Sequence, residues 1–187
     1  MTLHPDEAKI FFKNWLGLMA FVNDKYHLVK NFGNPKKPVG VSPDKVVTIK
    51  RKLWENAGII DGYIDSIRNL PDEDAQILKG WKNYIPGNFM VVNHLKKHSV
   101  FMNDKQDILY GVVGISGPIS DMIPADMLPM MIQTTLIPFK DRIIYDSLFS
   151  VHNIHISPNM KRSCKELYSE IKEKKGIICS LNAETTN

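Results

Sequence analysis

The sequence contains little cysteine and no long apolar run. Only Cys164 and Cys179 occur among its 187 residues, and they lack a CxxC spacing, so they cannot form the disulfide framework of a small secreted domain. The longest apolar runs, such as MLPMMI at 127–132, are too short to cross a bilayer. The N-terminal stretch lacks the cationic start and the small-residue cleavage site of a signal peptide. We therefore expect a cytoplasmic protein that keeps its N-terminal segment and has no membrane partner.

Signature motifs of common enzyme classes are also missing. The segment YGVVGISG carries Gly111, Gly114 and Gly117, but there is no GxGxxG, no Walker lysine, no GxSxG and no HExxH. The sequence therefore predicts no catalytic residue, no metal and no cofactor.

Arginine is scarce, although the chain is basic. Of 24 Lys and Arg residues four are Arg, and the net charge is +4. Residues 1–60 hold ten basic against five acidic side chains, whereas residues 61–85 hold three against five. The basic front could favour a polyanion, or it could be the solvated surface of helices. The only clusters in this front are Lys36-Lys37 and Lys50-Arg51-Lys52.

The first half of the chain has helical periodicity. Apolar residues recur at steps of three and four between Ile10 and Val22, including Trp15 and Leu18. Ser42-Pro43-Asp44 is a helix start signal, and acids at 72–74 suit the first turn of another helix. The segment YIPGN at 84–88 then marks a strong boundary. We expect a helical section over residues 1–85.

The second half favours strands. NFMVVNHLK, SVFMND and ILYGVVGI are short β-prone runs, and LIPFKDRIIYDS at 136–147 has the pattern of a hairpin. A helix over 158–175 begins at Ser157-Pro158 and ends before Gly176, GIICSL at 176–181 should be a final strand, and 182–187 is a polar tail. The sequence predicts one folded α+β unit: the helical section, then a β-rich section over 86–181 with a curved, mostly antiparallel sheet or small barrel that carries the C-terminal helix.

Several residue groups could carry a function, and each has a plainer interpretation. The hairpin tip Lys140-Asp141-Arg142 could be an interaction site, but charges at a turn also keep a sheet edge soluble. His94, His98, His152 and His155 could converge on a metal, but their spacing is a weak signal, and ordinary surface histidines are favoured. Cys164 lies near Lys161, Arg162 and Lys165, which would activate a thiol. Both cysteines could instead be buried structural residues, and they could meet if the last helix packs beside the last strand.

Four segments resemble a pattern in a family of Gram-positive bacterial proteins with no assigned activity. They are, in order, GNFMVVNHLKKHSVFM, YGVVGISGPI, LIPFKDRIIYDSL and GIICSL, and the likeness covers residues 70–181. The resemblance implies a shared unit of fold and supplies no catalytic residues. It also implies a glycine in the hairpin turn, where this chain has Asp141, and this difference weakens the case for a functional tip.

Three functions remain open at this point. The preferred hypothesis is a non-enzymatic binding or regulatory protein that acts through protein–protein contacts. The alternative is a nucleic-acid-binding protein that uses the basic front, with Lys50, Arg51 and Lys52, and the hairpin residues Lys96 and Lys97. In that case Phe89 and Phe101 could stack on bases, although such residues usually fill a core. The third is a small hydrolase or transferase with Tyr145, Asp146 and a histidine.

Overall fold

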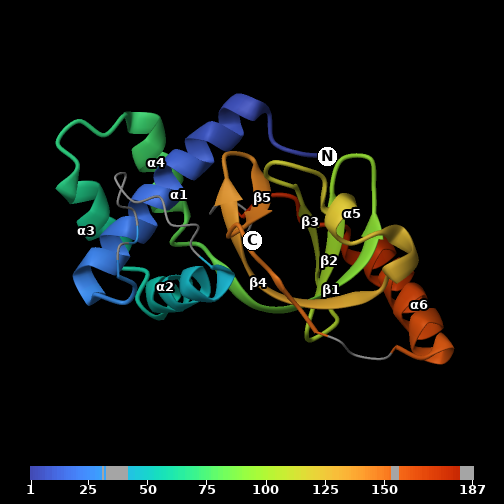
Figure 1. Cartoon of the computed structure of the whole chain (residues 1–187). Helices are drawn as coiled ribbons and strands as arrows, with labels where there is room; N and C mark the ends of the chain where they lie inside the picture. The colour runs from blue at the N-terminus through green and yellow to red at the C-terminus, as the bar shows by residue number, and fades with distance from the viewer. Residues whose placement is uncertain (31, 33–41, 153–155, 182–187) are drawn as a thin grey trace. The chain divides into compact units, whose positions relative to one another are not determined.

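The chain folds into two compact units (Figure 1). The structure is a computed structural model, and it describes residues 1–30, 32, 42–152 and 156–181. Residues Pro5–Lys82 form a helical unit, and Met1–His4 join the chain from Asn83 onward in a strand unit. The division after Lys82 lies close to the change from helical to strand patterning that the sequence places near residue 85.

The helical unit is built around a cluster of aromatic side chains. The first helix packs against the other three, and its buried stripe includes Phe11, Trp15 and Leu18, as the periodicity predicts. The Trp15 ring stacks on Phe11 and meets Trp81 edge-on, with centroids 5.9 and 5.8 Å apart. Leu16 lies outside this core and is 57% exposed. The helices are α1 (Pro5–Tyr26), α2 (Pro43–Glu55), α3 (Ile59–Ser66) and α4 (Asp72–Gly80).

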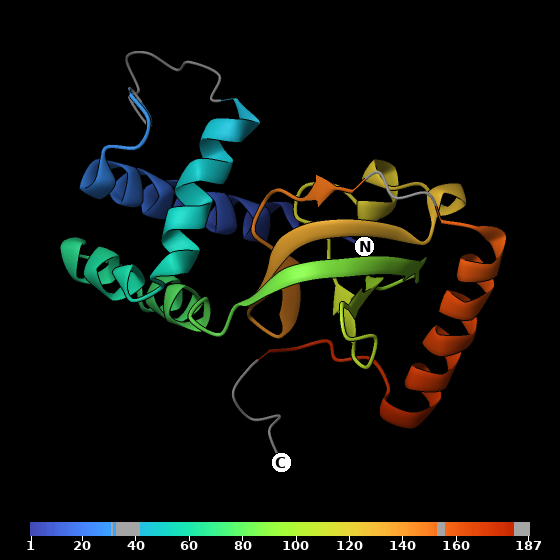
Figure 2. The same cartoon turned by 90° about the horizontal axis from the view of Figure 1, so that it is seen from below.

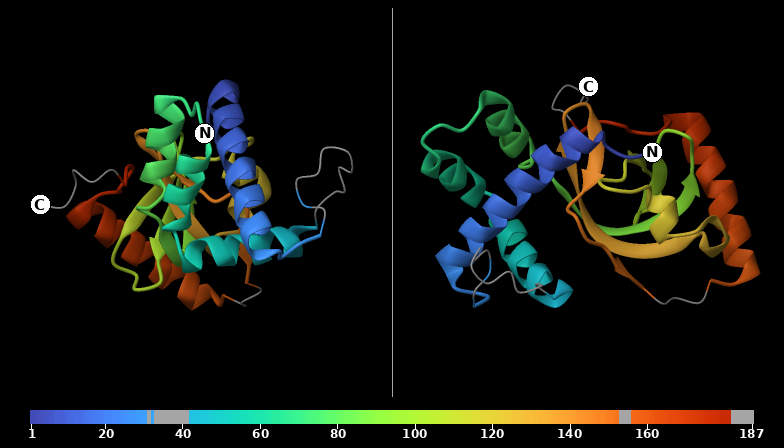
Figure 3. Two further views of the ribbon diagram at one scale, coloured as in Figure 1. Left: turned by 90° about the vertical axis from the view of Figure 1, so that its left-hand side faces the viewer. Right: turned by 45° about the horizontal axis from the view of Figure 1, so that its top comes forward.

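The strand unit is a six-stranded mixed sheet in which five strands close into a ring (Figure 3). The order is β1-β2-β3-β5-β4-β6, and the additional pairing of β1 with β4 closes the ring. The long strands β1 and β4 run side by side in Figure 2, from the Ile85–Leu136 pair to the Val91–Met130 pair. The strands are β1 (Ile85–His94), β2 (Ser99–Asn103), β3 (Leu109–Val112), β4 (Met130–Phe139), β5 (Arg142–Tyr145) and β6 (Ser150–Val151).

The predicted α+β class and the mostly antiparallel sheet are confirmed. One pairing is parallel, between β3 and β5 at Val112 and Ile143. This pairing joins strands that are not consecutive in the chain, so no hairpin signal could predict it. Between β3 and β4 the chain forms a short helix α5 (Ile119–Met122) and a 3₁₀ turn η1 (Ala125–Met127).

Along each strand, successive side chains point alternately into the ring and towards the outer surface that the C-terminal helix covers. Phe89 lies inside with Phe101 and Tyr110, at ring centroid distances of 6.3 and 6.1 Å. Val100 and Met102 face the other way and pack in a cluster with Ile171 of α6 (Pro158–Lys175). The C-terminal helix therefore covers the sheet by its apolar face, as predicted.

The predicted final strand at 176–181 is shorter than expected. It makes a single parallel bridge, between Ile178 and Tyr110. The Ile178 N–H donates to Leu109 O at 2.9 Å and the Gly111 N–H donates to Ile178 O at 2.8 Å. The short β-prone run NIHI at 153–156, which the sequence also predicts as a strand, falls largely on 153–155, and these lie outside the described residues. Within the described part of the chain, none of the helices combines the length and apolar character needed to cross a membrane.

Candidate functional site

A groove of about 310 Å³ lies between α6 and the sheet. Its helical wall consists of residues spaced three and four apart, which places them on one face of α6. Its other wall comes from β1 and from the segment that precedes β4. The lining residues are Val92, Asn93, Leu128, Pro129, Lys161, Cys164, Lys165, Tyr168 and Ser169.

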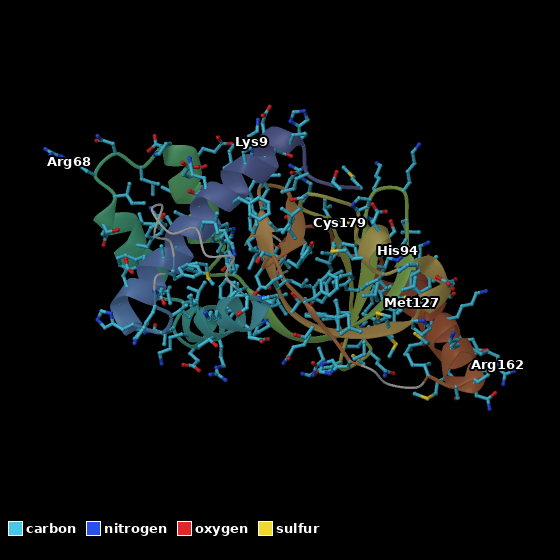
Figure 4. The ribbon with its side chains drawn as sticks, viewed as in Figure 1. Lys9, Arg68, His94, Met127, Arg162 and Cys179 are labelled. Carbon is cyan, nitrogen blue, oxygen red and sulfur yellow. The ribbon has the colours of Figure 1, made fainter. Side chains whose placement is uncertain are left out.

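The groove combines an apolar wall with a polar and cationic one. Lys161 and Lys165 are exposed, whereas the Asn93 amide nitrogen donates to the Tyr168 hydroxyl at 3.3 Å. The Cys164 thiol donates to the Met90 thioether, with the sulfurs 3.3 Å apart, and burial raises the pKa of Cys164. Two solvent-facing methionines precede lining residues in the chain. They are Met127, which is 51% exposed and is labelled in Figure 4, and Met160, which is 49% exposed.

Sequence reasoning expected only a docked helix here. The signal that could have found the groove is the pair Lys161 and Lys165, four residues apart and beside the apolar face of a helix. The opposite wall, at Asn93 and Pro129, is far away in the chain and gives no local signal.

The residues predicted for nucleic acid lie in both units. Lys50 is only 8% exposed in the helical unit, while Arg51 is exposed. The Lys52 ammonium donates to the Glu55 carboxylate at 2.9 Å, and this bond raises the pKa of Lys52. The ammonium also lies 5.1 Å from the centre of the Tyr26 ring. The Lys50–Lys52 cluster therefore presents one exposed cation, one paired cation and one buried cation.

The second predicted basic group is in the strand unit. Lys96 and Lys97 are exposed in the turn between β1 and β2. Phe89 and Phe101, on the adjoining strands β1 and β2, are 1% and 0% exposed. These rings fill the core and are not available to stack on bases.

The charged hairpin tip is a tight turn between β4 and β5. Lys140 has a φ of +57°, a left-handed backbone conformation that residues other than glycine adopt mainly in turns. Its ammonium lies 6.0 Å from the centre of the Phe139 ring. The Asp141 carboxylate lies 3.3 Å from Arg142 Nε, so charges of the tip engage each other and the strand end.

The histidines have different surroundings. Both ring nitrogens of His94 are engaged, with Ser99 Oγ at 2.8 Å and Ile123 O at 2.8 Å. The backbone N–H of His152 donates to Met131 O, and His155 lies outside the described residues. In those parts of the chain that the structure describes, no group of three or more His, Cys, Asp or Glu residues could hold a metal ion.

His98 forms a pair with Cys179. The Cys179 sulfur lies 3.9 Å from His98 Nδ1, and the two side chains meet over Gly111. A Cβ atom on Gly111 would lie 2.9 Å from both the sulfur and His98 Cδ2. The two cysteines are free, and the predicted alternative in which they meet is not realised. Sequence reasoning missed this pair because its members are 81 residues apart.

Tyr145 and Asp146 are both buried. The Tyr145 hydroxyl contacts the Met122 sulfur at 4.0 Å, and burial, with a smaller contribution from the Asp146 charge, raises the pKa of Tyr145 to about 12. Asp146 is 0% exposed, and its carboxylate accepts a hydrogen bond from Thr134 Oγ1 at 3.2 Å. This arrangement stabilises the end of β5 from within.

Comparisons of the chain with protein-family models, with curated proteins and with solved structures find no match.

Proposed function

We propose that this protein is a non-enzymatic binding protein and that its groove under α6 takes a short segment of a partner protein. The observation that carries the proposal is the composition of the groove. Apolar groups from Val92, Leu128 and Pro129 face a helix that presents two lysines. A partner segment with an apolar side chain next to carboxylates would match both walls.

The flanking methionines support a protein partner. Thioether side chains are unbranched and polarizable, so they adapt to apolar side chains of varied shape and are common on peptide-binding surfaces. Met127 and Met160 each expose about half of their surface and directly precede the lining residues Leu128 and Lys161 in the chain. Nucleic acid would gain less from them, because a polyanion is held mainly by its phosphates.

The test is fluorescence anisotropy with four labelled probes: an acidic peptide with central Leu and Phe, its basic counterpart, a polar peptide, and a single-stranded oligonucleotide. We expect the acidic apolar peptide to bind most tightly. Binding of the oligonucleotide alone, with a steep loss between about 50 and 200 mM salt, would overturn the proposal.

Variants of the helix locate the binding. Reversing the charge of either groove lysine, by Lys161→Glu or Lys165→Glu, should weaken binding of the acidic peptide by about tenfold. One favourable charge pair is lost and one repulsion is added. Arg162→Glu makes the same charge change on the same helix, at an exposed residue outside the groove lining and on the outer end of α6 in Figure 4. It should change affinity by less than about threefold. Equal effects of the three variants would contradict the groove as the site.

A further inference from the structure

We infer that Cys179 is a covalent modification site, at which its thiol forms a mixed disulfide with a low-molecular-weight disulfide while His98 takes the thiol proton. The inference is independent of the groove, because it rests on residues outside the groove lining. His98 comes from the turn after β1, Gly111 from β3, and Cys179 from the segment after α6.

The geometry matches what an activated thiol needs. A nucleophilic cysteine requires a base within reach of its proton. The Cys179 sulfur lies 3.6 Å from Ile177 O, a carbonyl that cannot take up the proton, and 3.9 Å from His98 Nδ1, which can. Gly111 leaves the space in which the two side chains meet. The Cys179 residue is exposed, while its thiol is partly buried against Gly111 and His98, so a small disulfide would reach the sulfur from the exposed side of the residue.

The charges around the pair favour a neutral imidazole that can accept a proton. Burial lowers the pKa of His98, and so do the positive charges of the N-terminal amine and of Lys97. Burial also raises the pKa of the Cys179 thiol, so free thiolate is scarce near neutral pH and transfer of the proton to His98 becomes important. His98 Nε2 is buried and has no hydrogen-bond partner among the described residues.

The reaction is a thiol–disulfide exchange. His98 Nδ1 accepts the proton of Cys179 Sγ, and the sulfur attacks one sulfur of the small disulfide. The disulfide bond breaks as the new S–S bond forms, and the leaving thiolate takes the proton. Cys179 is oxidised to a mixed disulfide, and half of the small disulfide is reduced to a thiol.

Cys164 provides an internal comparison. Its thiol is half-buried and donates a hydrogen bond to the Met90 sulfur, with the two sulfurs 3.3 Å apart. It lies in the groove with Lys161 and Lys165. The lysines near Cys164 in the sequence would activate its thiol, whereas the structure places a base beside Cys179.

The first experiment measures the rate of thiol modification in the folded full-length chain with dithiodipyridine. This disulfide is uncharged near neutral pH, so Lys97 does not steer it. The variants Cys164→Ser and Cys179→Ser each leave one thiol, and we expect the chain that keeps Cys179 to react at least about tenfold faster. A faster reaction at Cys164 would overturn the inference, as would equal rates. Intact mass after reaction with oxidised glutathione identifies the modified chain.

The second experiment tests His98 by the shape of the pH profile. In Cys164→Ser the rate should level off below the pKa of the thiol and fall only where His98 protonates, below its ordinary value of 6.5. In Cys164→Ser with His98→Gln it should fall about tenfold per pH unit throughout, because only free thiolate reacts, and at neutral pH it should be about tenfold slower. Parallel profiles would overturn the role of His98. If circular dichroism shows that the double variant is unfolded, the profile of Cys164→Ser decides alone: a levelling supports the pair and an uninterrupted fall contradicts it.

Discussion

At the scale of single residues, Tyr145 links burial in the strand unit to alkaline stability. Its pKa is raised from 10.0 to about 12, so the folded state favours the protonated phenol more than the unfolded chain does. This contribution is fully present below pH 10 and is lost as pH rises towards 12, by about 2–3 kcal/mol. We expect the free energy of unfolding to fall over this window, and to fall less in Tyr145→Phe.

The comparison with Tyr145→Phe isolates this residue, because the pKa values of Tyr63 and Tyr110 are also raised by burial. Urea unfolding should be followed by circular dichroism between about pH 8 and pH 12. If the two proteins lose stability in parallel, Tyr145 does not carry the effect.

A second buried contact joins the Thr134 hydroxyl to the Asp146 carboxylate. The hydroxyl lies 3.2 Å from Asp146 Oδ1 and 3.0 Å from Leu148 O. Thr134→Val keeps the shape of the side chain but leaves a buried carboxylate short of a donor, so we expect a loss of about 1–3 kcal/mol in unfolding free energy. Thr135→Val is the matched control, at a neighbour with similar burial, 5% against 6%. A loss as large in Thr135→Val would point to the valine itself rather than to the missing hydroxyl.

At the scale of elements, two identical start signals have different outcomes. The sequence places Ser-Pro before α2 and before α6, and both helices begin at the proline. Only at α6 does the serine side chain accept a hydrogen bond, from the Met160 N–H at 3.3 Å. At α2 the Ser42 side chain makes no capping hydrogen bond. The pattern therefore predicted where the helices begin, but not which cap forms.

This difference predicts unequal effects of one substitution. Ser157→Ala should destabilise the protein by about 1 kcal/mol, because it removes the acceptor for an otherwise unsatisfied N–H. Ser42→Ala should cost less than about 0.5 kcal/mol. Thermal unfolding of the two variants measures both effects. An equal loss of stability would show that the hydrogen bond of the Ser157 side chain does not stabilise the protein.

Long-range pairings explain what the sequence could not predict. Helix faces and hairpins arise from residues near one another in the chain, so the stripe at Trp15 and the turn at Lys140 could be predicted. The sequence predicts a small barrel as one form of the sheet, but not the pairings that close it, which are β1 with β4 and, in parallel, β3 with β5. The same reason applies to the sites. The residues on the face of α6 that carries Lys161 and Lys165 recur at helical spacing, so that face can be read from the sequence. The groove wall at Asn93 and the pairing of His98 with Cys179 form only when the ring folds, so they cannot.

At the scale of the whole molecule, each unit has its own core. The three tryptophans of the chain all lie in the helical unit, where Trp15 packs against Trp54 at 6.1 Å and against Trp81 at 5.8 Å. Asp74 of α4 is buried among these helices, accepts a hydrogen bond from Asn14 at 2.9 Å and pairs with Lys13. An apolar core and a satisfied buried charge are both internal to Pro5–Lys82.

We therefore expect the fragment Pro5–Lys82 to fold alone. Its size, roughly eighty residues, is near the lower range in which one core suffices, so its stability should be modest but its unfolding cooperative. Tryptophan emission should match that of the full chain, because the three indoles make ring contacts with one another and with Phe11. Circular dichroism should show a helical protein with a thermal transition. Asp74→Ala should lower the unfolding free energy of the fragment by about 1–3 kcal/mol, whereas Asp72→Ala, at an exposed residue of the same helical turn, should change it by less than about 0.5 kcal/mol. A fragment with the red-shifted emission of solvated indoles and no transition would show that the helical core depends on the rest of the chain.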